Sequence, residues 1–66
     1  MMPYTLIARQ DDAINQACYI ADTNGSPVAV VLRDGWFRIV EDADEMERLI
    51  DEERWEQVAV LDSVSA

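Results

Sequence analysis

The stretch that decides the fold is PVAVVLRDGWFRIV, Pro27 to Val40, in which two apolar segments flank Asp34-Gly35. Asp-Gly readily adopts the positive φ angles of a two-residue type I′ turn, and aromatic and β-branched residues favour strands on both sides of it. The stretch therefore predicts a β-hairpin. A two-residue loop also sets the register, which predicts four facing pairs: Arg33 and Trp36, Leu32 and Phe37, Val31 and Arg38, and Val30 and Ile39.

The residues before this hairpin support two interpretations. ACYIAD, residues 17–22, followed by Asn24-Gly25, is typical of another strand and turn, which would complete a three-stranded meander. The alternative is a helix from Asp12 to Asp22 that ends at Gly25. Such a helix would place four residues on one face: Ile14, Ala17, Cys18 and Ala21. We favour the meander because aromatic and β-branched residues flank both turns.

Alternation along the predicted strands assigns their side chains to two faces of the sheet. The expected core face holds Tyr19, Ala21, Val28, Val30, Leu32, Phe37 and Ile39. The other face holds Cys18, Ile20, Ala29, Val31, Arg33, Trp36, Arg38 and Val40. So apolar a face is unusual on a solvent-exposed surface, and we expect another chain, a partner or residues 1–16 to cover it.

The second informative stretch is acidic: EDADEMERLIDEERWE, Glu41 to Glu56. It holds nine carboxylates and two arginines, a net charge of −7 out of −9 for the whole chain. We expect a helix over about residues 43–53, capped by Asp42 or Asp44. Its apolar stripe should dock on the core face and consists of Ala43, Met46, Leu49 and Ile50.

The ends of the chain complete the predicted architecture. QVAVL, residues 57–61, is expected to be a final strand paired within the sheet. Residues 1–9 are expected to form an edge strand, with a first turn of helix as the alternative. The predicted fold class is α+β, a small antiparallel sheet (a meander of three to five strands) packed by one acidic α-helix. Sixty-six residues, half of them hydrophobic, make a single domain spanning residues 1–66.

Cysteine and histidine usage limits the chemistry of the chain. One cysteine, Cys18, and no histidine exclude an intrachain disulfide framework and a Cys/His zinc site. We interpret Cys18 as an inert, packed thiol. The chain shows no signal-peptide pattern and no apolar run near the roughly 20 residues that span a bilayer, so we expect a soluble cytoplasmic protein.

The carboxylates show no catalytic or metal-binding pattern. No histidine, thiol or serine constellation accompanies them, and nothing predicts an apolar cleft that would separate their pKa values for acid–base catalysis. An EF-hand loop beginning at Asp42 would need glycine at its sixth position, where Glu47 stands. We therefore expect no enzyme activity, no metal and no cofactor.

On a helical wheel, however, the acids form two rows. Glu41, Glu45, Glu52 and Glu56 form one row, and Asp44, Glu47 and Asp51 form the other. Arg48 lies between them and is expected to pair with acids at i±3 and i±4: Asp44, Glu45, Asp51 and Glu52. Carboxylates four residues apart stand about 6 Å apart along a helix axis, and DNA phosphates advance about 3.4 Å per step. The rows would therefore meet roughly every second phosphate subsite of a basic groove that binds nucleic acid. A merely solubilising acidic face is the alternative.

A second candidate surface combines Trp36 with Arg33 and Arg38 on the non-core face. It is either an anchor for a protein partner or a cation–π cluster that closes the sheet surface. The predicted partner-binding residues are thus Asp44, Glu45, Glu47, Asp51, Glu52, Glu56, Trp36 and Arg38.

The overall charge indicates the kind of partner. A pI of about 4.1 disfavours direct binding to nucleic acid or to anionic membranes and favours a basic protein partner. In size, acidity and lack of catalytic chemistry, the chain resembles the small acidic inhibitors that phages direct against host defences, the anti-CRISPR and anti-restriction proteins. That resemblance implies a viral DNA mimic that acts in the host cytoplasm. The alternatives are an accessory or antitoxin-like protein with a basic partner, and a domain that dimerises through its sheet.

Overall fold

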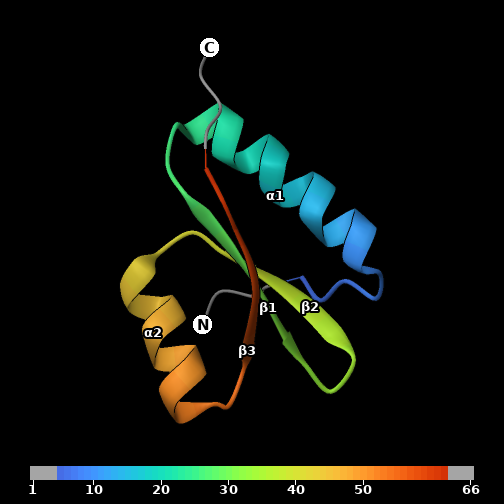
Figure 1. Cartoon of the computed structure of the whole chain (residues 1–66), viewed down its shortest axis with the longest axis vertical. Helices are drawn as coiled ribbons and strands as arrows, with labels where there is room; N and C mark the ends of the chain where they lie inside the picture. Colours follow the sequence, from blue (N-terminus) through green and yellow to red (C-terminus); the bar gives the residue numbers. More distant parts are fainter. Residues whose placement is uncertain (1–4, 63–66) are drawn as a thin grey trace.

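The computed structural model describes residues 5–62 (Figure 1). Its elements follow in the order α1 (Gln10–Asn24), β1 (Val28–Arg33), β2 (Trp36–Val40), α2 (Ala43–Glu52) and β3 (Glu56–Leu61). The three strands form one antiparallel sheet in the order β2-β1-β3. The two helices lie on opposite sides of this sheet (Figure 1). The predicted α+β class with a small antiparallel sheet is confirmed.

The central hairpin forms as its turn residues predict. Asp34 and Gly35 have φ angles of 55° and 82°, the positive values that a type I′ turn requires. β1 pairs with β2 in the predicted register from Arg33–Trp36 to Val30–Ile39.

The predicted strand over residues 17–22 is wrong, because this segment belongs to α1. Ala13, Ala17 and Ala21 recur every four residues and are fully buried, so small side chains bring the helix close to the sheet. Gly25 has a φ of 68° and donates its N–H to the oxygen of Ala21 at 2.8 Å. The Asn-Gly pair therefore ends a helix and does not turn a hairpin.

This correction moves two side chains out of the predicted core. Tyr19 is 73% exposed on α1, although the strand pattern placed it on the core face. Cys18 is also exposed, so our interpretation of it as a packed thiol is wrong. Both residues lie off the alanine face that contacts the sheet.

The two faces of β1 and β2 are as predicted, but the partner of the second face is not. Val28, Val30 and Phe37 form the first core, beneath α1. The predicted docking of the acidic helix on this face is wrong, because α1 already occupies it. The second face packs instead against α2 and against Trp55, three residues after the end of α2. This core consists of Ala29, Val31, Val40, Leu49 and Trp55, with Met46 beside it. α2 and Trp55 therefore cover the face that we expected another chain, a partner or residues 1–16 to cover.

The last strand and the first residues complete the sheet. β3 pairs with β1, as the QVAVL pattern predicts, and a bulge at Val58 separates the pairs Val30–Ala59 and Val31–Gln57. At the outer edge of β2, Ile7 forms a single antiparallel bridge with Phe37. The rest of the predicted first strand includes residues 1–4, which lie outside the described residues. Between residues 5 and 62, no helix has the length and apolar character needed to cross a membrane.

Candidate partner-binding surface

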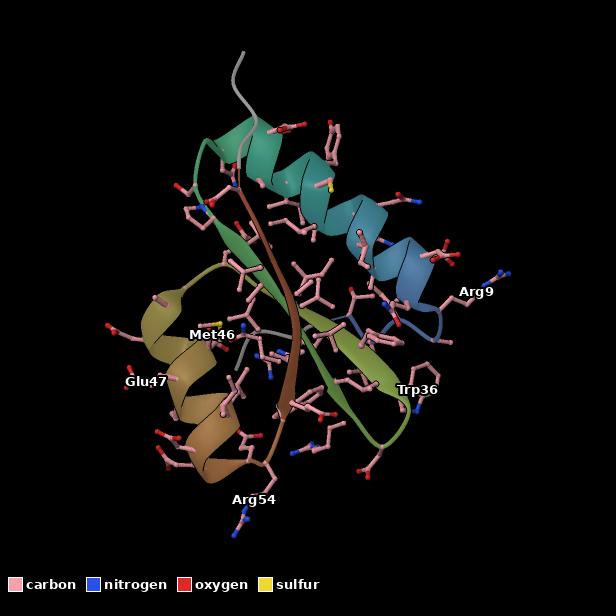
Figure 2. The ribbon with its side chains drawn as sticks, viewed as in Figure 1. Arg9, Trp36, Met46, Glu47 and Arg54 are labelled. Carbon is pink, nitrogen blue, oxygen red and sulfur yellow. The ribbon has the colours of Figure 1, made fainter. Side chains whose placement is uncertain are left out.

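The orientation of α2 on the sheet determines which of its acidic side chains a partner can contact. Asp42 caps the helix, since its carboxylate accepts the N–H of Asp44 at 3.0 Å. Leu49 is fully buried against the sheet. Figure 2 shows Met46 on the side of α2 toward the sheet and Glu47 pointing away from it. The side opposite Met46 and Leu49 is therefore the one offered to a partner.

That outward side carries Asp44, Glu47 and Asp51. We define the acidic face as these three residues together with Glu52, which is exposed beside them. All four side chains are exposed. Within residues 5–62, none of the four takes part in an ion pair. The row from Asp44 to Asp51 extends about 10 Å along the helix axis at about 1.5 Å per residue. Glu56, also exposed, follows at the start of β3.

Glu45 does not belong to this surface. Nη2 of Arg38 donates to its carboxylate at 2.6 Å, and the Arg38 residue is only 8% exposed. The pair links the inner side of α2 to β2. Arg38 is accordingly part of the core beneath the helix, and its predicted role in an exposed patch is wrong.

Arg48 pairs with none of the four acids that the wheel predicted. It donates to Glu53, the C-cap residue of α2, at 2.8 Å. Arg33 lies 3.6 Å from the other carboxylate oxygen of Glu53. The hydrogen bond from Arg48 is the main cause of a lowered pKa at Glu53; desolvation opposes it, and the charge of Arg48 together with Trp55 and Arg33 adds to the lowering. The indole nitrogen of Trp55 is buried and has no hydrogen-bond partner of normal geometry among residues 5–62.

The predicted cation–π cluster forms around a different tryptophan. The guanidinium carbons of Arg33 and Arg38 lie 4.5 and 5.8 Å from the centre of the Trp55 ring. Trp36, in contrast, is 45% exposed and projects from the molecule on the side opposite Glu47 (Figure 2). The acidic face and Trp36 therefore do not form one continuous surface. Trp55 was not predicted as a member of this cluster. The one sequence signal for it is its position, a tryptophan between the acidic helix and the last strand.

The described part of the chain offers no grouping of three or more Asp, Glu or Cys side chains placed to hold a metal ion. Comparison with known proteins adds no relative: no family model matches the chain, and neither a curated protein nor a solved structure is similar to it. The acidic face is therefore the candidate partner-binding site, on the basis of its geometry.

Proposed function

We propose that this chain is a non-enzymatic acidic inhibitor that blocks the nucleic-acid-binding surface of a basic host defence protein, as anti-CRISPR and anti-restriction proteins do. The observation that carries the proposal is the outward row of Asp44, Glu47 and Asp51, three exposed carboxylates without an ion pair in the described structure. Its place of action would be the cytoplasm of the host cell.

The way α2 is held supports this use of the row. Leu49 is buried in the second core, and the Arg38–Glu45 pair and the Trp55 stack hold the helix to the sheet. A fixed helix presents its carboxylates without first losing backbone freedom, which is a common cost of binding. The spacing along the axis follows the phosphates of a nucleic acid strand closely enough for a basic groove to accept it.

The charge of the whole chain adds to the proposal. A net charge of −9 on 66 residues steers the chain toward a basic surface and speeds association at low salt. Like charges three and four residues apart on α2 repel by a few tenths of a kcal/mol per pair. Glu45 is paired with Arg38, but the carboxylates of the acidic face are retained in spite of this repulsion. Their retention is consistent with a role in binding a partner.

The alternatives differ in what they require of the surface. An accessory or antitoxin-like protein would use the same acidic face on another basic partner. Dimerisation through the sheet loses its support, because α1 and α2 cover the two faces.

Pull-down from host extract with mass spectrometry would identify the partner, and a competition assay with its DNA or RNA would test the mechanism. The variant Asp44→Lys/Asp51→Lys should weaken binding by at least about tenfold, and binding to the wild type should weaken steeply as salt rises. The matched control is Asp12→Lys/Asp22→Lys, which makes the same charge change at exposed positions of α1.

The outcomes separate the candidate functions. Equal weakening by both double variants would show that only net charge matters and would refute a specific acidic face. Tight binding to a basic partner without competition from nucleic acid would refute mimicry and leave the accessory or antitoxin-like function.

A further inference from the structure

An apolar groove opens beside the acidic face, at the end of the sheet where β1 begins and β2 and β3 end. It encloses about 170 Å³ between this end of the sheet and the first turn of α2. Most of its lining is apolar and includes Val28, Ala29, Val40, Ala43, Met46 and Val60; Ser26 and Pro27 also line it. Glu41 and Asp42 also border it, and both are exposed.

The groove exists because small side chains line it where larger ones would close it. Ala29 from β1 and Ala43 from the first turn of α2 both contribute only a methyl group. Val60, on the edge strand β3, stays 48% exposed. Pockets for small molecules usually enclose about 300–1,000 Å³, so this groove has room for about one side chain and not for a typical cofactor or metabolite.

We propose that the groove receives one aliphatic side chain from a protein segment that carries arginine or lysine on both sides of it. This inference rests on the proposed function, because it assumes a basic partner, and it adds the anchor by which that partner is held. The apolar walls fit the aliphatic group. Glu41 and Asp42 at the border, with Asp44 and Glu47 on the adjoining acidic face, fit the flanking cations.

Charge also decides between a basic partner and a second copy of this chain. Among residues 5–62, no arginine lines the groove, and each copy carries a net charge of −9. Two copies meeting here would place like-charged borders against each other, which disfavours association. The positive N-terminal end of α2 also borders the groove, but the groove still favours a cationic partner, because the Asp42 carboxylate accepts the N–H of Asp44 at this end.

The test uses two fluorescein-labelled peptides, Arg-Arg-Leu-Arg-Arg and Arg-Arg-Ser-Arg-Arg, and measures their binding to the full chain by fluorescence anisotropy. The wild type should bind the leucine peptide about tenfold more tightly. Ala43→Phe should fill the groove and remove the difference, while Ala8→Phe, the same change at an exposed alanine outside the groove, should keep it. If Ala43→Phe does not fold, Val60→Phe fills the groove from β3.

Amide chemical shifts locate the anchor independently. Adding the leucine peptide should shift the resonances of Ala29, Ala43 and Val60, and the serine peptide should shift them much less. Equal, salt-sensitive binding of both peptides to the wild type would overturn the groove while leaving the acidic face intact. If neither peptide binds, the groove is overturned and the acidic face does not take arginine-rich segments either. Shifts of the groove resonances on raising protein concentration alone would assign it to a second copy.

Discussion

The guanidinium group of Arg33, at the end of β1, lies over Trp55, and its central carbon is 4.5 Å from the ring centre. The same group donates a hydrogen bond of 3.0 Å to the backbone oxygen of Glu53. Trp55 itself is buried in the second core, beside Leu49. One arginine thus joins the sheet to the chain segment that leaves α2, and it contributes to the position of the acidic face.

We expect Arg33→Met to lower the free energy of unfolding by about 1–2 kcal/mol, because it keeps the aliphatic stem but removes the cation–π contact and the hydrogen bond. Urea unfolding followed by tryptophan fluorescence would measure the change. Arg9→Met is the matched control: it removes the same charge from an exposed arginine that has no ion pair in the described structure. Its effect should stay within about 0.5 kcal/mol. Equal losses in both variants would indicate a net-charge effect and contradict the contact.

The parts of the fold that were predictable depend on local chemistry. Asp34-Gly35 imposes its turn and register through backbone geometry alone, so the hairpin follows from the sequence. Asn24-Gly25 is compatible with both a hairpin turn and a helix end. Residues 17–22 then take the state that tertiary packing favours, which is a helix with a buried alanine face. Alternation likewise separates the two sheet faces but does not say which helix covers which face.

For the candidate site, the sequence likewise predicted the local pattern on the helix but not the contacts between elements. The wheel separates Met46 and Leu49 from Asp44, Glu47 and Asp51, and the structure keeps that separation. Glu45 borders the apolar stripe, so its role depends on which side chain of the sheet lies opposite it. The sheet offers Arg38, whose side chain is nine-tenths buried. A pairing across two elements cannot be found from helical spacing alone.

The Arg38–Glu45 pair predicts opposite effects for two charge reversals on α2. Glu45→Lys should lower the free energy of unfolding by about 1–3 kcal/mol, because it leaves a buried arginine facing a like charge; the partial exposure of Glu45 keeps the loss below that of a fully buried pair. Asp51→Lys should change it by no more than about 0.5 kcal/mol, or raise it slightly, since it relieves repulsion and suits the negative end of the helix. Thermal and urea unfolding would measure both. Equal losses would show that Arg38 does not depend on Glu45.

Glu53 predicts a pH dependence. Its pKa is lowered below the ordinary 4.5, chiefly by the hydrogen bond from Arg48. A carboxylate with a lowered pKa contributes stability above the unfolded value, and that contribution disappears as the pH falls through the folded value. The difference in unfolding free energy between wild type and Glu53→Gln should therefore be largest above pH 4.5 and shrink below it.

An NMR titration of the Glu53 side chain would check the cause of this pH dependence. Its midpoint should lie below 4.5 in the wild type and move up in Arg48→Gln, which removes the main hydrogen-bond donor. A midpoint that does not change in Arg48→Gln would assign the lowering to Trp55 or Arg33 instead.

Backbone strain at Arg54 predicts a stabilising substitution. Arg54 follows α2 with a φ of 63°, a left-handed conformation that costs a residue with a Cβ atom about 1–2 kcal/mol. The conformation lets the chain reverse so that the N–H of Trp55 reaches the oxygen of Leu49 at 3.1 Å. The Arg54 side chain is exposed and, among residues 5–62, makes no ion pair, so its removal sacrifices no such contact. Figure 2 shows it projecting away from the fold.

Arg54→Gly should accordingly raise the free energy of unfolding by about 0.5–1 kcal/mol, because glycine adopts this φ without the Cβ clash and the gain exceeds its greater freedom in the unfolded chain. For a domain of this size, about 1 kcal/mol corresponds to a rise in Tm of about 4–8 °C in a thermal scan. Arg54→Ala is the control, since it removes the same charge but keeps the Cβ atom, and it should give no rise. Equal Tm gains in both variants would trace the effect to the lost arginine side chain and would contradict strain at this position.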